Sequence, residues 1–248
     1  MGEYLDANGL RTYFERRGSG DPVLLLHGGG GTAESLTALA DILAEHYEVL
    51  IPERRWHART ACVGKELTYE VMAEDTIAFM DRLGVTDAHL IGQSDGANVA
   101  LLTAVQRPDH VRKLVLMGGN FNTDYLSSES RAWLKGLSPE IARQVFPSVV
   151  DLYFNVTPDA EARFPVLLQM LGNLYASDWR IPTMSLEGVA TKTLVMAGDR
   201  DSVPIAHTLE LFRSIPNAQL CVVPEADHEF ARKKPELIGP IIVRFLGS

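Results

Sequence analysis

The sequence predicts an α/β protein with a mostly parallel sheet that is covered by helices on both faces. Short apolar runs, such as Val23–Leu26 and Val111–Met117, alternate along the chain with helical patterns such as Tyr69–Leu83. The apolar runs are continuous, as expected of parallel strands buried on both faces. Residues of catalytic types follow the carboxyl ends of several runs, where sheets of this kind place their ligand sites.

The first half of the chain begins with a predicted hairpin, because Asn8-Gly9 is a turn dipeptide between two strand-like segments. The next apolar run ends at a run of glycines. Helical spacing is clearest in the segment that precedes Gly84, the residue expected to end that helix. In order, we expect strands at Glu3–Asp6, Leu10–Arg16, Val23–Leu26 and Val49–Ile51, and helices at Thr37–His46 and Tyr69–Leu83.

The second half continues the alternation but contains a purely helical interruption. Residues 120–187 show helical patterns separated by prolines, with no buried-strand run between them. We therefore expect one core domain from residues 1–119 and 188–248, with residues 120–187 inserted as a small helical cap. The expected strands are Ala88–Gly92, Val111–Met117, Lys192–Ala197 and Leu220–Val223. The expected helices are Ala97–Val105, Ile205–Ile215 and Pro235–Leu246 in the core, and Ser130–Leu137, Ile141–Tyr153 and Ala160–Ala176 in the cap.

Composition and charge exclude several functional classes. The chain has 248 residues, 46% of them hydrophobic, which is enough for a large core. Its net charge of −9 argues against a nucleic-acid partner. Cys62 and Cys221 lack the neighbours of a disulfide framework or zinc site, and neither a metal nor an organic cofactor is expected. With no signal peptide or membrane-spanning run, we expect a cytoplasmic monomer or homodimer without a membrane partner.

The segment around Ser94 predicts a nucleophile elbow. A serine in a sharp strand-to-helix turn is in strained backbone, and the positions two before and two after it must be tiny. Gly92 and Gly96 meet that requirement, between an apolar strand and a helix-forming run. Ser94 is therefore the candidate nucleophile.

Two later loops supply partners that such a serine needs. A hydroxyl is a poor nucleophile until a base takes its proton, and an imidazole base needs a carboxylate that fixes its tautomer. His228 follows the last predicted strand and is the candidate base. Asp199 and Asp201 both follow the strand before it, and either could be the carboxylate. Five other histidines have no partner pattern and are expected to be structural: His27, His46, His89, His110 and His207.

The glycines after Leu26 predict an oxyanion hole. Attack on an acyl carbon turns its oxygen into an anion, which backbone N–H groups can stabilise by about 3 to 4 kcal/mol. The residue after the nucleophile, Asp95, should supply one N–H group. The Gly28–Gly30 loop should supply the other, most simply from Gly29.

These motifs together resemble the α/β-hydrolase fold family, over the whole chain apart from the insertion. The motifs that carry the resemblance are the glycine run after His27, the pentapeptide around Ser94, the segment from Gly198 to Pro204, and the His228 loop. The resemblance implies a serine hydrolase without a cofactor. It also implies that Asp201, rather than Asp199, is the acid of the triad.

The residues Ser94-Asp95-Gly96 are similar to a valacyclovirase-like branch of the family. In that branch the matching aspartate helps to hold a substrate amino group. The Asp95 side chain is therefore either a structural hydrogen-bond partner or a binding site for a cationic ester. Asn120 and Phe121, directly after a strand end, are the other candidates for substrate binding.

The segment from Glu53 to Thr60 departs from the family pattern. Trp56 and Ala58 stand where the family has glycines. If those positions take a positive φ, each replacement costs on the order of 1 kcal/mol or forces another loop path. A displaced loop would bring Trp56 or His57 to the pocket mouth, and simple surface packing is the alternative. Gln93, before the candidate nucleophile, is also unusual and could open room or add a hydrogen bond near the acyl site.

The sequence therefore predicts a serine hydrolase that acts on a small-molecule carboxylic ester, either amine-bearing or small and apolar. Hydrolysis of a C–C bond, lactone opening and cofactor-free perhydrolysis use the same triad and remain open. A ligand receptor on the hydrolase scaffold is the alternative from another class, and it requires tight binding with negligible turnover.

Overall fold

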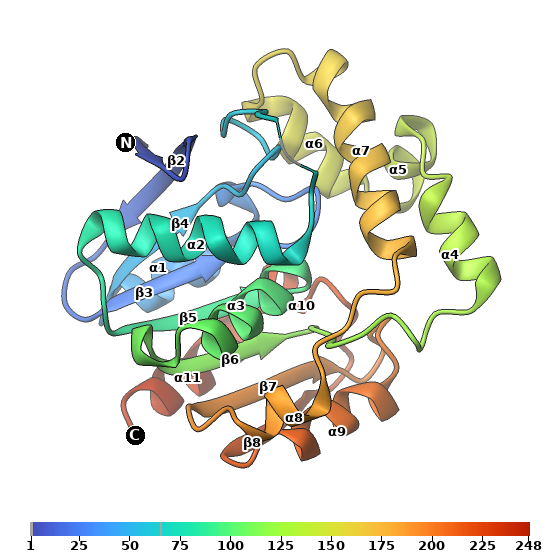
Figure 1. Ribbon diagram of the computed structural model, residues 1–248. Coiled ribbons are helices and arrows are strands. Elements are labelled where there is room, and N and C mark those ends of the chain that lie inside the picture. The colour runs from blue at the N-terminus through green and yellow to red at the C-terminus, as the bar shows by residue number, and fades with distance from the viewer. Residues whose placement is uncertain (1, 65) are drawn as a thin grey trace.

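The computed structural model describes residues 2–64 and 66–248, and its centre is one eight-stranded sheet (Figure 1). The strand order is β1-β2-β4-β3-β5-β6-β7-β8. Pairs β1–β2 and β2–β4 are antiparallel, and all the others are parallel, as predicted. The strands are β1 Glu3–Ala7, β2 Leu10–Arg17, β3 Pro22–Leu26, β4 Glu48–Pro52, β5 Ala88–Gln93, β6 Val111–Met117, β7 Lys192–Gly198 and β8 Ala218–Val223.

Helices cover both faces of this sheet. Alternate residues of each central strand point to opposite faces and join two separate hydrophobic cores. Val23 and Leu25 of β3 join the core beneath α1, α10 and α11, whereas Leu24 and Leu26 join the core beneath α2, α3 and α9. Burial on both faces explains the continuous apolar runs. The helices are α1 Thr37–Ala44, α2 Tyr69–Leu83, α3 Asp95–Gln106, α9 Ile205–Ser214, α10 Phe230–Lys233 and α11 Pro235–Leu246, with 3-10 helices η1 Ala33–Leu36 and η2 Pro108–His110.

The segment between β6 and β7 is helical. Its helices are α4 Ser128–Lys135, α5 Pro139–Val145, α6 Pro147–Val156, α7 Ala160–Ala176 and α8 Thr183–Glu187. Figure 1 shows α4 to α7 gathered on the side toward which the β6 arrow points. Arg163 donates to the Thr60 carbonyl, and Trp179 donates to Glu70 of α2, so the segment is bonded to a core loop and to a core helix. The boundaries at residues 120 and 187 stay a prediction.

Three details of the helices differ from the sequence prediction. A single helix over Ile141–Tyr153 is wrong, because Phe146 leaves the helical region (φ −127°, ψ 51°) and separates α5 from α6. The following Pro147 explains this break, since a residue before proline disfavours helical backbone. The short helices α8 and α10 were not predicted. By contrast, α2 has its predicted bounds, and Gly84 ends it at φ 69°.

Candidate active site

Ser94 lies at the bend between β5 and α3, in the strained conformation that the glycine pattern predicts. Its backbone has φ 54° and ψ −123°. A Cβ atom on Gly92 would lie 2.2 Å from the Gly96 carbonyl oxygen, and one on Gly96 would lie 2.1 Å from the Leu26 oxygen. Larger residues at these positions would push the strand and helix apart, so the two glycines make the elbow possible.

The structure brings His228 and Asp201 to Ser94. The Nε2 atom of His228 lies 2.8 Å from Ser94 Oγ, and its Nδ1 atom lies 2.7 Å from Asp201 Oδ1. The loop that carries His228 connects β8 to α10, and Asp201 follows β7. Gly118, after β6, passes directly beneath them, since a Cβ there would lie 3.1 Å from the imidazole. Ser94, His228 and Asp201 thus form one hydrogen-bonded line.

Asp199 is not part of this line. Its Oδ1 atom accepts a hydrogen bond from the Ala226 N–H at 3.1 Å, and the side chain is exposed. Asp201, in contrast, is buried to 1% side-chain exposure and also accepts from the Val203 N–H. The geometry therefore places Asp201 against His228 and Asp199 in a turn.

The charge of Asp201 controls the basicity of His228. Burial by itself lowers the pKa of an imidazole, but the hydrogen bond to Asp201 and its negative charge outweigh that effect. The pKa of His228 is consequently raised above the ordinary 6.5. Gln93 adds a second restraint, because its Nε2 donates to the His228 carbonyl at 3.2 Å. Gln93 thus makes the additional hydrogen bond that the sequence allowed.

The glycine loop after β3 lies against Ser94. A Cβ on Gly28 would be 3.2 Å from the Ser94 Cβ, and one on Gly29 would be 2.0 Å from the Tyr175 Oη and 2.5 Å from Asp95 Oδ2. The N–H group of Asp95 belongs to the first turn of α3, whose donors have no partner within the helix. Both predicted donors of the oxyanion hole, Gly29 and Asp95, therefore belong to segments beside Ser94. Their role stays a prediction.

The Asp95 side chain is buried and has two hydrogen-bond partners. Tyr69 of α2 donates to Oδ1 at 2.7 Å, and Tyr175 of α7 donates to Oδ2 at 2.8 Å. Burial and the nearby Asp95 charge raise the pKa of both phenols well above 10, so both remain donors at neutral pH. These contacts favour the structural role for the carboxylate over the cation-binding role.

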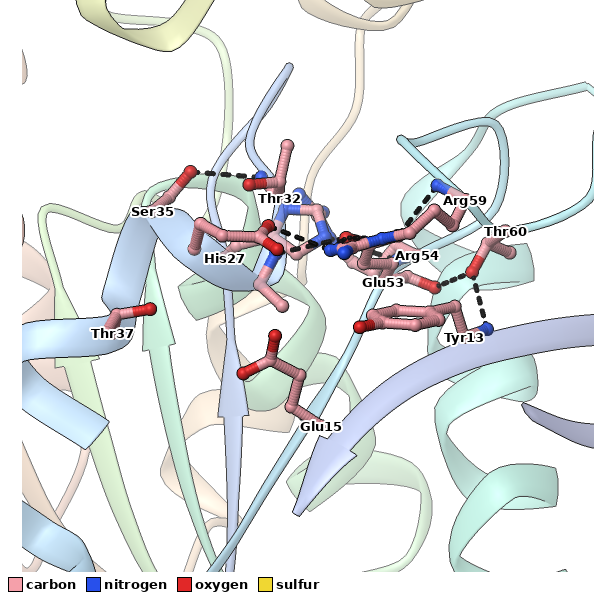
Figure 2. Close-up of polar contacts among 12 residues, drawn as sticks. Tyr13, Glu15, His27, Thr32, Ser35, Thr37, Glu53, Arg54, Arg59 and Thr60 are labelled. Carbon is pink, nitrogen blue, oxygen red and sulfur yellow. Dashed lines mark hydrogen bonds and ion pairs between the residues drawn. The ribbon is translucent and has the colours of Figure 1, made fainter. Parts of the chain in front are cut away.

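Arg54 places a positive charge near this carboxylate. The side chain is buried, and its Nη2 atom lies 3.4 Å from His27 Nδ1. Burial lowers the pKa of Arg54, and the charge of Asp95 opposes this effect. The other two arginines of the loop are bound internally: Arg55 pairs with Asp75 at 2.7 Å, and Arg59 pairs with the buried Glu53 (Figure 2). These three arginines, which are close together in the sequence, thus do not form a surface patch.

Two buried histidines hold the glycine loop, and sequence reasoning assigned neither this role. His57 Nδ1–H donates to the Arg55 carbonyl at 2.8 Å, which leaves Nε2 to accept from the Gly30 N–H at 3.1 Å. His27 accepts from the Arg54 N–H through Nε2, and its Nδ1 lies 2.8 Å from the Gly28 carbonyl. Burial lowers the pKa of His57 to about 3 and that of His27 well below 6.5, so both act as neutral rings.

The loop from Glu53 to Thr60 has glycine-like backbone at the two positions where the family has glycines. Trp56 has φ 68° and Ala58 has φ 41°, so each residue takes the conformation that favours glycine. The positive φ at both positions favours the strained alternative over the displaced path. His57 is fully buried, so neither the pocket mouth nor surface packing was correct for it. Trp56 is partly buried and packs against the core on the α2 face.

Asn120 and Phe121 lie at the end of β6 but make mainly internal contacts. The Asn120 N–H donates to Asn98 Oδ1 at 2.8 Å, and its side chain pairs with Asn98 and Tyr125. The Phe121 ring is 2% exposed and stacks on His207, with centroids 4.6 Å apart. Their contact with substrate stays a prediction.

Comparisons with known proteins identify the family. A model described as the alpha/beta hydrolase fold matches residues 21–188, and the chain therefore belongs to the α/β-hydrolase fold family. Among curated proteins, it is 28% identical to a 2-hydroxy-6-oxo-6-phenylhexa-2,4-dienoate hydrolase of Burkholderia cepacia, over 96% of this chain and 92% of that one.

Solved structures agree on the fold. The meta-cleavage product hydrolase CumD of Pseudomonas fluorescens IP01 has a TM-score of 0.85 at 22% identity, over 99% of this chain and 98% of that one. A thermophilic esterase of Thermogutta terrifontis has a TM-score of 0.81 at 23% identity, over 100% and 98% of the two chains. The valacyclovirase-like branch stays a prediction.

The described residues include neither a helix that could span a membrane nor a group of side chains that could hold a metal ion. No helix of residues 2–64 and 66–248 has both the length and the apolar character needed to cross a membrane. Within the same residues, no group of three or more His, Cys, Asp or Glu side chains could hold a metal ion.

Proposed function

We propose that this protein is a serine hydrolase that cleaves carboxylic esters through an acyl-enzyme intermediate. The observation that carries the proposal is the hydrogen-bonded line from Ser94 Oγ through His228 to Asp201, with distances of 2.8 and 2.7 Å. A nucleophile, a base and a group that orients the base are the three parts required for acyl transfer. Membership of a family of hydrolases agrees with it.

The reaction proceeds in two halves. Ser94 Oγ attacks the ester carbonyl while His228 Nε2 takes its proton, and Asp201 stabilises the imidazolium that forms. The N–H groups of Asp95 and Gly29 stabilise the developing oxyanion. His228 then gives the proton to the departing alcohol, which leaves an acylated Ser94. A water molecule, deprotonated by the same imidazole, attacks this ester and releases the acid.

The contacts of Asp95 bear on the ester class. Its two oxygens already accept from Tyr69 and Tyr175, and Arg54 contributes a positive charge nearby. A substrate ammonium would have to compete with these groups. We therefore propose small, apolar, uncharged esters ahead of amine-bearing ones.

C–C bond hydrolysis is the second candidate, because several curated relatives bear the names of hydrolases that act on C–C bonds. Besides the Burkholderia cepacia protein, the chain is 25% identical to a 2-hydroxymuconate semialdehyde hydrolase of Pseudomonas putida, over all of this chain and 95% of that one. Lactone opening and perhydrolysis would use the same triad.

A panel of chromogenic esters tests the proposal. Acyl length and charge are varied, and each ester is assayed with the wild type and with Ser94→Ala. We expect turnover of uncharged esters that Ser94→Ala abolishes, and labelling of Ser94 by an organophosphate. A meta-cleavage dienoate is added to the panel. Turnover of this compound, with no turnover of any ester, would favour the C–C hydrolase. Tight binding of a ligand with negligible turnover of all compounds would favour the receptor.

A second comparison tests whether Asp95 recognises cations. Asp95→Ala is expected to lower kcat/KM by similar factors for matched amine-bearing and neutral esters, because the carboxylate supports Tyr69 and Tyr175 in either case. A loss confined to the amine-bearing ester would contradict the structural role and restore the cationic substrate.

The raised pKa of His228 predicts the pH dependence. Only the neutral imidazole accepts a proton from Ser94, so kcat/KM should rise with pH and reach half its maximum above pH 6.5. Asp201→Asn removes the charge that raises this pKa, and the midpoint should move to lower pH. A profile of kcat/KM between pH 5 and 9 measures both. An unmoved midpoint in the variant would show that Asp201 does not set the His228 pKa.

A further inference from the structure

Tyr125 lies in the loop between β6 and α4 and is not part of the triad or oxyanion hole. Its ring is half-buried and lies against His207 of α9, with centroids 4.8 Å apart. Its phenol oxygen accepts a hydrogen bond from Asn120 Nδ2 at 3.1 Å. The ring and the oxygen are therefore both held in place.

A chain of amides fixes the direction of that hydrogen bond. The Asn120 backbone N–H can only donate, so the Asn98 atom that it meets at 2.8 Å must be the oxygen. Asn98 Nδ2 then donates to Asn120 Oδ1 at 3.2 Å, which turns Asn120 Nδ2 toward Tyr125. Tyr125 consequently uses its oxygen as an acceptor here. Within residues 2–64 and 66–248, its own O–H group donates no hydrogen bond to another residue.

The same chain connects the phenol to segments that carry or contact the candidate triad. Gly118, two residues before Asn120, lies against His228 and Asp201. Asn98 is in the first turns of α3, and its N–H donates to the Ser94 carbonyl at 3.2 Å. Burial raises the pKa of Tyr125 to about 12, and the negative charges of Asp95 and Asp201 contribute to the increase. At neutral pH the phenol is protonated, and it is a donor whose proton has no protein acceptor among those residues.

We propose that Tyr125 is a specificity-determining residue that donates a hydrogen bond to a second, uncharged oxygen of the substrate, beside the scissile ester. This inference rests on the proposed esterase function and narrows its substrate class. A keto or ether oxygen accepts such a bond. A carboxylate fits less well, because Asp95 and Asp201 would repel it.

Two pairs of esters locate the second oxygen. Methyl 3-oxobutanoate is compared with methyl butanoate, which varies the acyl part. The ester 2-methoxyethyl butanoate is compared with butyl butanoate, which varies the alcohol part. Tyr125→Phe should lower kcat/KM about tenfold more for the oxygen-bearing ester of one pair than for its partner, because the variant keeps the ring and loses only the donor.

Tyr153→Phe is the matched control. The Tyr153 hydroxyl is buried in the helical segment and has no hydrogen-bond partner within residues 2–64 and 66–248. This variant should change both members of each pair equally. Equal losses with Tyr125→Phe in both pairs would overturn the inference while leaving the esterase proposal intact.

Binding separates the two proposals if the wild type cleaves no ester. The affinities of the same four esters are then measured with Ser94→Ala and with Ser94→Ala combined with Tyr125→Phe. A preference for an oxygen-bearing ester that only the combined variant loses would support the role of Tyr125, although the esterase function had failed. The same affinities in both proteins would overturn it.

Discussion

Asp201→Asn is expected to lower kcat by about 10⁴-fold, the loss found when the acid of a serine triad becomes an amide. The amide can present its N–H to His228 Nδ1, which forces the other tautomer and removes the acceptor that Ser94 needs. It also removes the negative charge that stabilises the imidazolium. The measurement is kcat on the best ester of the panel, with the melting temperature as a check on folding.

Asp199→Asn is the matched control, two positions away in the same loop. Asparagine keeps the Oδ1 atom that accepts from the Ala226 N–H, so the turn should persist and kcat should change by less than about tenfold. If Asp199→Asn instead lost more activity than Asp201→Asn, the acid of the triad would be wrongly identified.

Gly29→Ala is expected to lower kcat by about 10²- to 10³-fold, the effect of losing one oxyanion donor. The added methyl group would lie 2.0 Å from the Tyr175 Oη and 2.5 Å from Asp95 Oδ2, so the loop must move. Displacement of its N–H weakens transition-state stabilisation more than substrate binding. The loss should therefore appear in kcat, with a much smaller change in KM.

Removal of the clashing hydroxyl tests the cause of this loss. Gly29→Ala combined with Tyr175→Phe should recover part of kcat, because the phenol oxygen is the nearer of the two obstacles. Tyr175→Phe alone provides the baseline. Full activity in Gly29→Ala would mean that this loop does not form the oxyanion hole.

The sequence predicted the fold and the hydrogen-bonded line of Ser94, His228 and Asp201, because both depend on local patterns. Apolar runs mark strands that are buried on both faces, and Gly92 and Gly96 are required by the bend at Ser94. The position of His228 follows from its place after the last strand. The choice between Asp199 and Asp201 needed the family resemblance, because both residues follow β7 and either is chemically suitable.

The supporting contacts could not be predicted, because their partners are distant in sequence or are backbone atoms. His57 accepts from the Gly30 N–H, and no side-chain pattern encodes a backbone donor 27 positions away. Tyr69 and Tyr175 meet at Asp95 only after α2 and α7 have packed. The positive φ of Ala58 was indicated only because the family has glycine there.

The helical segment leaves the sheet after β6 and returns at β7, and these two strands are hydrogen-bonded neighbours. Insertions or deletions within it therefore leave the register of every strand pair unchanged. Natural variation or directed evolution can remodel this segment as a replaceable module, while the reactive groups at the strand ends are inherited intact.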